Sequence, residues 1–365
     1  MHIALFISCL QMGGSERVMT NLAHYLHENG HRVTLVTQYK AQREYELNPE
    51  IDRIYSEITD EETDSRIHNF IARYSKLRNI WKEVKPDVIL SFIGKNNVMA
   101  IATSRGLNIP IAVSVRGEPH EEYIDRGTRI AAKMLFPLAD KVVLQTSDSA
   151  KFFSRRIQRK SIIMPNGLNP AFIKPVFEGE RKKEIVSVGR IDANKNHMLL
   201  IEAFEELLKE KPETFGEYKV IIYGDGELRP KLLDYVKNHG LENNVFLPGL
   251  VKHVEDVIDK SEIFVLTSNT EGLPNTLLEA MSLGLVSIST DCPCGGPRDI
   301  IEHKKNGFLI LVGDKMDLKE NLQEIAPNSQ LKQEICKNAV KIREKYNPEL
   351  IHKKWEDFLV KMVKA

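Results

Sequence analysis

Short apolar runs alternate with helical patterns along this chain, and that alternation constrains the fold more than any other feature. The first forty residues contain the apolar run Ile3–Ile7, a turn at Gly13 and Gly14, a helical stripe and a second run at Val33–Val36. Repetition of this order is typical of parallel sheets covered by helices on both faces. The sequence therefore predicts an α/β protein.

The apolar runs fall into two sets. A Pro/Gly-rich stretch at Pro165-Asn166-Gly167 separates them, and 365 residues exceed the usual length of a single core. We expect one domain over residues 1–168 and a second over residues 169–347. The final helix, 348–365, has apolar residues along one side and is expected to pack back on the first domain.

Composition narrows the class of protein. The 51 basic residues balance 51 acidic ones, which argues against nucleic-acid binding. Four cysteines form no disulfide framework for a chain of this size, and the Cys292-Pro293-Cys294 segment is interpreted as a structural loop, not a zinc site. Because signal-peptide and membrane-span patterns are missing, we predict a cytoplasmic protein, soluble or attached to a membrane surface.

Two glutamates follow the predicted strand Ile263–Leu266. Glu271 lies in the loop before a helix that Pro274 and Asn275 are suited to begin, and Glu279 lies about one turn inside that helix. Neither has an obvious ion-pair partner nearby in sequence. Since ligands of open α/β sheets bind at the carboxyl ends of strands, hydroxyl groups of a sugar or ribose are plausible partners. The alternative is a solvated helix start decorated with acids.

Two further strand–helix junctions favour anions. Gly13 and Gly14 lie at the first junction, where backbone N–H groups and the helix dipole favour a phosphate, although a packing turn is the alternative. Arg190 and Lys195 lie at the first junction of the second domain and could neutralise a diphosphate, unless they are ordinary surface cations. No Asp-x-Asp pattern is present, so we expect no metal or other cofactor.

In order along the chain, these segments resemble family four of the sequence-classified glycosyltransferases, which are retaining enzymes with the GT-B fold that use nucleotide sugars. The matching segments are Gly13 to Arg17, Pro165-Asn166-Gly167, Gly189-Arg190 with Lys195-Asn196, Gly224 to Leu228, Pro248-Gly249 and Glu271 to Glu279. The resemblance implies two Rossmann-like domains whose parallel sheets face each other across a cleft, with the acceptor on the N-terminal side.

The resemblance also implies roles for residues. Arg190 and Lys195 would hold the donor diphosphate, Glu279 the ribose, and Glu271 would face the donor sugar. Gly272, Leu273 and Asn275 would contribute to the same donor site, mainly through backbone groups, and Gly13 and Gly14 would approach the reacting centre. Transfer would proceed by front-face substitution, which needs charge and position but no side-chain nucleophile.

The chain departs from many relatives at one position. A His commonly follows the strand that here is Ile111–Val115, whereas this sequence reads Ser114-Val115-Arg116-Gly117-Glu118-Pro119-His120. Arg116 is the positional match, and His120 is the second candidate to supply an imidazole. An ordinary loop histidine remains the alternative for His120.

The acceptor side is suggested by two basic segments that carry aromatic residues, 66–85 and 151–160. They would suit an anionic membrane surface and a polyprenyl diphosphate, or else form a core-facing stripe with a solvated basic back. We expect a UDP-linked donor, with an N-acetylhexosamine as one candidate sugar, and a glycan acceptor on undecaprenyl diphosphate or in a surface polysaccharide. The competing functions are a non-catalytic sugar-nucleotide-binding or scaffold subunit, a GT-B epimerase and a phosphorylase.

Overall fold

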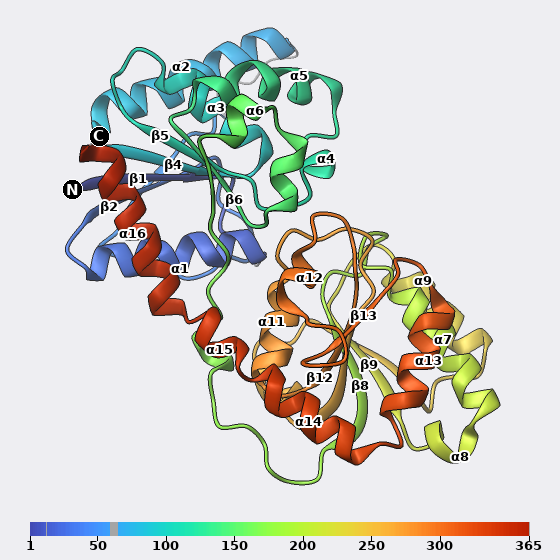
Figure 1. Cartoon of the computed structure of the whole chain (residues 1–365). Coiled ribbons are helices and arrows are strands. Elements are labelled where there is room, and N and C mark those ends of the chain that lie inside the picture. Colours follow the sequence, from blue (N-terminus) through green and yellow to red (C-terminus); the bar gives the residue numbers. More distant parts are fainter. Residues whose placement is uncertain (12, 59–64, 365) are drawn as a thin grey trace. The chain divides into compact units, whose positions relative to one another are not determined.

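The computed structural model describes residues 1–11, 13–58 and 65–364, and the chain divides into two compact units (Figure 1). Unit 1 comprises Met1–Gly167 together with Glu349–Ala365, and unit 2 comprises Leu168–Pro348. Each unit contains a parallel sheet with helices on both faces. The predicted α/β class is therefore confirmed.

The described residues of unit 1 form a seven-stranded sheet in the order β3-β2-β1-β4-β5-β6-β7, and each neighbouring pair is parallel. Strand order reverses between β1 and β4, which places the topological switch point there. The strands are β1 (His2–Ile7), β2 (Arg32–Thr37), β3 (Asp52–Tyr55), β4 (Val88–Phe92), β5 (Ile111–Ser114), β6 (Lys141–Leu144) and β7 (Ser161–Ile163).

Alternate residues of the unit 1 strands pack into two cores. Along β1, Ile3, Leu5 and Ile7 face one core, whereas Ala4 and Phe6 face the other. The α-helices of this unit are α1 (Gly14–Glu28), α2 (Arg66–Val84), α3 (Gly94–Ser104), α4 (Pro119–Glu122), α5 (Arg126–Leu135), α6 (Arg155–Gln158) and α16 (Pro348–Lys364). A 3-10 turn, η3, covers Asp148–Phe152.

Helix α16 contributes to the first of these cores beside α1 (Figure 1). Trp355 is fully buried there, and its ring lies 5.8 Å from that of Phe92. Polar contacts with α1 and the turn after it add to the packing, since Glu356 lies 3.0 Å from His31 Nε2. The last helix is therefore an integral layer of unit 1.

Unit 2 has, within the described residues, a six-stranded sheet in the order β10-β9-β8-β11-β12-β13, again with parallel neighbours. Its switch point lies between β8 and β11. The strands are β8 (Lys182–Val188), β9 (Lys219–Tyr223), β10 (Val245–Gly249), β11 (Ser261–Leu266), β12 (Val286–Thr290) and β13 (Phe308–Ile310).

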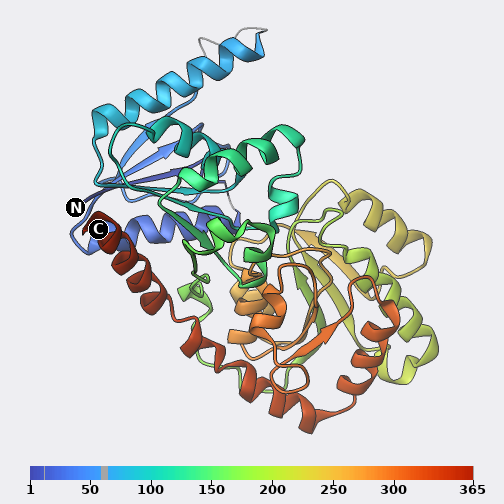
Figure 2. The ribbon, with the colours of Figure 1, turned by 45° about the horizontal axis from the view of Figure 1, so that its top comes forward.

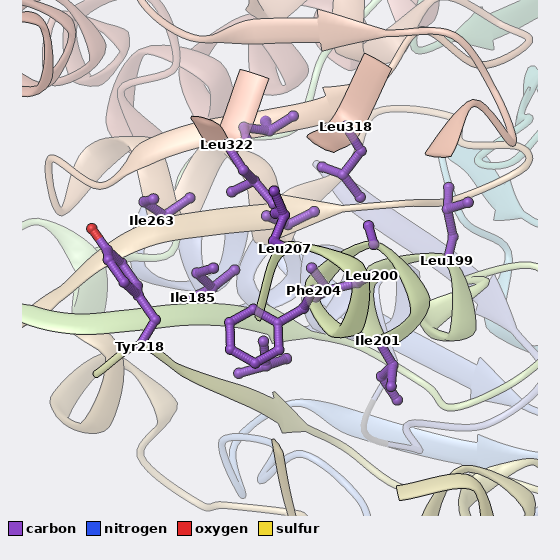
Figure 3. Packing of buried hydrophobic residues seen from close by; sticks show 14 of the residues in the cluster. Ile185, Leu199, Leu200, Ile201, Phe204, Leu207, Tyr218, Ile263, Leu318 and Leu322 are labelled. Carbon is purple, nitrogen blue, oxygen red and sulfur yellow. The ribbon is translucent and has the colours of Figure 1, made fainter. Parts of the chain in front are cut away.

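Helices cover both faces of this sheet. On one face, Leu200, Phe204 and Leu207 of α7 pack against strand residues and against Leu318 and Leu322 of α13 (Figure 3). The helices of unit 2 are α7 (His197–Glu210), α8 (Pro212–Phe215), α9 (Arg229–Asn238), α10 (Val254–Ile258), α11 (Asn275–Ser282), α12 (Gly296–Ile300), α13 (Lys315–Ile325), α14 (Ser329–Ala339) and α15 (Ile342–Lys345).

Candidate functional site

Two loops at the switch point of unit 2 carry most of the predicted site residues. One loop follows β8 and contains Arg190 and Lys195, and the other follows β11 and contains Glu271. Because β8 and β11 pair in parallel, both loops leave the same edge of the sheet. This is the edge at which open α/β sheets bind ligands.

Hydrogen bonds join these two loops. The Thr270 N–H donates to Asn194 Oδ1 at 3.0 Å, and Asn194 Nδ2 donates to the Thr270 carbonyl at 3.0 Å. The Thr267 hydroxyl donates to the Lys195 carbonyl at 2.9 Å. Roles for Asn194, Thr267 and Thr270 could not be predicted from the sequence, because each contact joins residues more than seventy positions apart. Their role is to hold the Lys195 segment against the Glu271 loop.

Lys195 and Glu271 form an ion pair. Lys195 Nζ lies 2.5 Å from Glu271 Oε1, and the two side chains are 17% and 13% exposed. The Ser268 hydroxyl donates to the same carboxylate oxygen at 2.6 Å. The sequence shows no obvious ion-pair partner near Glu271, and the fold brings Lys195 to it from the other loop. A lysine ammonium carries three donors, so this pairing leaves Lys195 able to donate to a phosphate as well.

Arg190 is exposed, and its Nε donates to Asp192 Oδ2 at 2.6 Å. The Lys195 N–H donates to the other Asp192 oxygen at 3.0 Å. Burial of the Asp192 carboxyl raises its pKa, but these two hydrogen bonds and the two cations outweigh burial and leave the pKa below its ordinary value. Asp192, which the sequence analysis did not single out, thus anchors both predicted diphosphate-binding residues.

Helix α11 begins at Asn275, as predicted, and Pro274 occupies the preceding capping position. Glu279 lies one turn inside the helix and is only 3% exposed. The Leu273 side chain belongs to the hydrophobic core, so the 272–275 segment can offer a ligand mainly its backbone. Figure 1 shows α11 against the sheet of its own unit.

A glycine turn supports this segment from behind. A Cβ on Gly296 would lie 1.7 Å from the Gly272 carbonyl oxygen and 3.1 Å from Leu273 Cα, so only glycine permits the observed backbone contact. In the preceding Cys292-Pro293-Cys294 segment, burial raises the pKa of the Cys292 thiol to about 12, and the Glu271 charge acts in the same direction. The Cys292 thiol is therefore protonated at neutral pH.

A second glycine contact fixes the loop after β8. Gly224 has φ of +146°, and a Cβ there would lie 1.8 Å from the Gly189 carbonyl oxygen. The Gly189 N–H donates to the Tyr223 carbonyl at 3.0 Å. The Gly224 turn after β9 therefore sets the position from which Arg190 leaves the sheet.

His197 is a buried neighbour of this loop to which the sequence analysis gave no role. It is the first residue of α7, and its Nδ1 lies 3.3 Å from the Ser187 hydroxyl. Burial lowers the pKa of His197 to about 4, and the nearby Lys195 charge acts in the same direction. The imidazole is therefore neutral at physiological pH and adds no charge to the site.

In unit 1, Gly13 and Gly14 lie at the start of α1, next to the switch point. Gly13 is extended and occupies the capping position, with no side-chain cap. A Cβ on Gly13 would lie 2.4 Å from Glu16 Oε2, so the Glu16 carboxylate lies against this end of the helix. A negative charge is favourable at that position because of the helix dipole.

Arg116 is buried in unit 1, with 6% exposure. Its Nη2 donates to Asn166 Oδ1, and its Cζ lies 4.6 Å from the centre of the Phe92 ring. Burial lowers the pKa of Arg116 to about 9, against the opposing effect of the Glu122 charge, so the guanidinium is charged at neutral pH. Its buried Nε has no hydrogen-bond partner among the described residues. Arg116 is therefore a charged group held by the Asn166 turn.

His120 lies in different surroundings. It belongs to the short helix α4 and is exposed, and its ring meets Phe152 edge-on at 4.7 Å between ring centres. The neighbouring Glu122 carboxylate accepts backbone N–H groups of Gly94 at 2.6 Å and Gly117 at 2.9 Å. The two residues proposed from one loop are thus a buried cation and an exposed imidazole.

One grouping of metal-ligand types occurs in the described part of the chain, at His253, Glu255 and Asp256. It lies at the start of α10 and includes none of the predicted site residues. The Lys174 ammonium donates to Asp256 Oδ1 at 3.0 Å and to the Glu255 carbonyl at 2.7 Å. A cation is thus already supplied to this grouping by the protein.

Comparison with known proteins gives the family. A family model described as Glycosyltransferase Family 4 matches residues 12–172, and one described as Glycosyl transferases group 1 matches residues 170–342. A relative from Campylobacter jejuni is 27% identical over the full length of both chains. Its name is GalNAc-alpha-(1->4)-GalNAc-alpha-(1->3)-diNAcBac-PP-undecaprenol alpha-1,4-N-acetyl-D-galactosaminyltransferase.

Two other proteins extend the comparison. An Escherichia coli enzyme named UDP-Gal:alpha-D-GlcNAc-diphosphoundecaprenol alpha-1,3-galactosyltransferase is 25% identical over 65% of this chain and 66% of its own. The structure of sucrose-phosphate synthase from Thermosynechococcus elongatus superposes with a TM-score of 0.85 at 15% identity, covering 100% of this chain and 99% of the other. Since the two family models together span residues 12–342, the chain belongs to the GT-B glycosyltransferases that combine a Family 4 region with a group 1 region.

Proposed function

We propose that this glycosyltransferase moves a sugar from a UDP-linked donor to a glycan carried on undecaprenyl diphosphate, with retention of configuration and without a metal ion. The observation that carries the proposal is the Lys195–Glu271 pair, held at a sheet edge by hydrogen bonds from both loops. The names of two relatives support the acceptor, because both include a diphosphoundecaprenol, and one also names UDP-Gal as donor. An N-acetylhexosamine is the proposed sugar, since the Campylobacter relative is named as an N-acetylgalactosaminyltransferase.

The proposed chemistry uses charge and position. Arg190 and Lys195 bind the donor diphosphate and neutralise the charge that develops on it as its bond to the anomeric carbon breaks. The departing phosphate oxygen accepts the proton of the acceptor hydroxyl, and that hydroxyl oxygen bonds to the same face of the anomeric carbon. Glu271 orients Lys195 and faces the donor sugar, while Arg116 or His120 serves the acceptor half. Comparing the anomeric configuration of donor and product by NMR tests retention, and an inverted product contradicts it.

Nucleotide binding tests the donor site. Thermal unfolding is followed with UDP, GDP, ADP and NAD, each with chelator present. We expect UDP to stabilise the protein, by about 2.7 kcal/mol when its concentration is a hundred times the dissociation constant. Glu279→Gln preserves the shape of this buried side chain but removes a charged acceptor. The affinity for UDP, measured from the thermal stabilisation, should therefore fall at least roughly tenfold.

Glu334→Gln on α14 is the matched control, because Glu334 is exposed in the same unit. It should leave the UDP response unchanged. A response to none of the nucleotides contradicts the donor proposal and favours the scaffold function. A response that requires a divalent ion contradicts the metal-free site but leaves the nucleotide assignment standing.

The second part of the proposal is that the protein attaches to a membrane surface through α2. Ile67, Phe70 and Ile71 are 74%, 56% and 57% exposed, whereas Leu77 and Trp81 on the same helix are buried in the core of unit 1. Figure 2 shows the N-terminal turns of α2, in light blue, extending beyond the strands of that unit. The membrane-facing and core-facing interpretations of 66–85 thus each fit a different half of the helix.

The 151–160 segment fits the membrane interpretation less well than the sequence suggested. Phe153 is buried, and Phe152 packs against Phe153 and Tyr123, so these aromatic rings face the core. The basic side chains Lys151, Arg155, Arg156 and Arg159 remain exposed. Among the helices of the described residues, none is long and apolar enough to cross a membrane.

Flotation with vesicles tests the role of α2. We expect the protein to bind vesicles that contain phosphatidylglycerol, and Ile67→Ser/Phe70→Ser/Ile71→Ser to lose most of that binding because it removes the apolar contact. Leu311→Ser, which removes another apolar side chain with 65% exposure, is the control and should bind as the wild type does. Equal binding by all three proteins excludes α2 as the contact.

A further inference from the structure

The short helix α15 lies beside α11 in unit 2 (Figure 1). Arg343 of α15 holds the last residue of α11, because its Nε and Nη2 donate to the Ser282 carbonyl at 2.9 and 2.6 Å. The same Nη2 also donates to the Lys174 carbonyl at 2.6 Å. Carbonyls at the end of a helix lack partners within it and carry partial negative charge, so a guanidinium is favourable there. One side chain thus anchors the C-terminal end of α11.

The residues after Arg343 anchor a second helix, α12. Lys345 Nζ donates to the Asp299 carbonyl at 2.8 Å, and the Tyr346 hydroxyl donates to the same carbonyl at 3.3 Å. Asp299 lies near the C-terminal end of α12, and the first residue of that helix supports the 272–275 segment from behind. The α15 segment therefore holds the C-terminal ends of both helices that adjoin this segment.

Apolar packing joins the same elements. Ile342 and Tyr346 belong to the hydrophobic core that contains Leu277 and Leu278 of α11, and Tyr346 is only 2% exposed. The polar contacts of Arg343 and Tyr346 therefore form at the edge of a packed core, where a displaced helix would also lose apolar contacts.

The anchored end of α11 is close to Glu279 along the helix. Ser282 follows Glu279 by three residues, which is less than one helical turn, and the whole helix has eight residues. Since a helix this short moves as a rigid element, a shift of its C-terminal end also shifts Glu279 and the segment before Asn275. The position of Arg343 therefore bears on the proposed donor site without contact with the donor.

The anchoring segment also lies next to the places where the chain passes between the two units, before Leu168 and after Pro348. The Leu168 N–H donates to the Tyr346 carbonyl at 2.9 Å. The Ser282 hydroxyl donates to the Phe172 carbonyl at 3.2 Å. Both connections are thus fastened, at their unit 2 ends, to the α11–α15 contact.

We propose that Arg343 and Tyr346 are positioning residues for the donor site and act through α11 and α12. The proposal rests on the proposed function in one respect, namely that UDP binds at Glu279 and the 272–275 segment. It adds that the geometry of this site is set from the opposite ends of the two helices, by the segment that leads into α16.

Arg343→Met tests the anchor of α11, since it keeps an unbranched apolar side chain and removes the guanidinium donors. We expect its affinity for UDP, measured by calorimetry, to fall at least about fivefold, the lower end of coupling between distinct sites. Arg343→Lys keeps a cation at the carbonyls and should recover part of the affinity. The measurements are made at a temperature at which unfolding curves show each variant to be fully folded, so lost stability alone does not change the affinity.

Arg78→Met is the matched control. Arg78 of α2 also donates to carbonyls at the end of another helix, those of Thr103 and Arg105 at 2.8 and 2.7 Å, but it belongs to unit 1. This variant should lose stability as Arg343→Met does and keep the UDP affinity of the wild type.

The anchor of α12 is tested separately. Lys345→Met/Tyr346→Phe removes both donors to the Asp299 carbonyl and should weaken UDP binding at least about twofold, the scale of a change made at a distance from the ligand. UDP binding as strong as that of the wild type would contradict the role of Tyr346.

Amide hydrogen exchange without nucleotide tests the anchor directly. Arg343→Met should accelerate exchange in α11 more than in α7, because a local contact is lost and α7 lies on the other face of the sheet. Equal acceleration in both helices, or unchanged UDP affinity in Arg343→Met, overturns the positioning role. If the wild type itself binds no UDP, the donor site is contradicted and the positioning role with it. If the wild type binds UDP and Arg343→Met binds it equally well, the positioning role alone is contradicted.

Discussion

Replacing Lys195 by Ala should reduce sugar transfer by at least about 100-fold, the scale expected when one preorganised charge is removed from a transition state. Lys195 Nζ is held 2.5 Å from Glu271, and the Lys195 backbone is fixed by Thr267 and Asp192. Deleting the ammonium removes the charge that would stabilise the departing diphosphate. Initial rates with UDP-linked donors and a diphospholipid acceptor give the result.

Lys195→Ala also leaves the Glu271 carboxylate without its cation. The control must therefore break a similar ion pair at a position away from the proposed site. Lys332 and Glu262 are such a pair, with the same 2.5 Å contact and 13% exposure of each side chain. Lys332→Ala should lower stability by a similar amount but leave the turnover rate unchanged. Arg190→Ala should lose turnover on the same scale as Lys195→Ala. Near-normal rates in both variants would contradict the assignment of the diphosphate site to this edge of the sheet.

Replacing Gly296 by Ala should have the largest effect on stability. The added Cβ would lie 1.7 Å from the Gly272 carbonyl oxygen, and a backbone atom cannot move aside as a side-chain end can. The turn and the 272–275 segment must therefore separate, at a cost of at least ~2 kcal/mol in the free energy of unfolding. Because that segment precedes α11, UDP affinity should fall together with stability. Denaturant titration and calorimetry measure the two effects.

Gly313→Ala is the matched control in the same unit. Gly313 has a positive φ, of +74°, which Gly296 does not, and nothing lies within 4 Å of the position that its Cβ would take. Gly313→Ala therefore has a backbone cost of about 1–2 kcal/mol but no steric clash, and nucleotide affinity should not change. If Gly296→Ala were no worse than Gly313→Ala in both measurements, the support of the 272–275 segment by the Gly296 turn would be disproved.

The strands could be predicted where they are buried on both faces. The apolar run Ile263–Leu266 lies in β11, and Val286–Ser289, whose alternating serines are also fully buried, lies in β12. The edge strands β3 and β7 were missed because they are short and partly exposed, so their residues show neither a long apolar run nor clear alternation. The edge strands β10 and β13 could nevertheless be predicted, because their apolar residues Val245, Leu247, Phe308 and Ile310 are buried. The local pattern therefore fails where an edge strand has few buried apolar residues.

The site was predictable as a set of positions but not as a set of contacts. Arg190, Lys195 and Glu271 follow strands whose ends must meet at one sheet edge, and that much follows from the pattern. The pairing of Lys195 with Glu271, and the anchoring of Arg190 by Asp192, depend on how two loops pack. Arg116 shows the same limit, because its contact with Asn166 joins residues fifty positions apart.

The membership of α16 in unit 1 has a consequence for synthesis of the protein. Ribosomes release residues 168–348 before Trp355, so unit 2 has its whole core available while unit 1 still lacks the helix that closes one of its two cores. Domains generally acquire structure in the order of their emergence. Here the domain that begins first must finish last, and protease protection of ribosome-bound chains should appear in unit 2 before it is complete in unit 1. A nascent chain arrested before α16 would expose the apolar surface of unit 1 that α16 covers in the complete protein. A chaperone would therefore bind the chain most strongly at this stage of synthesis.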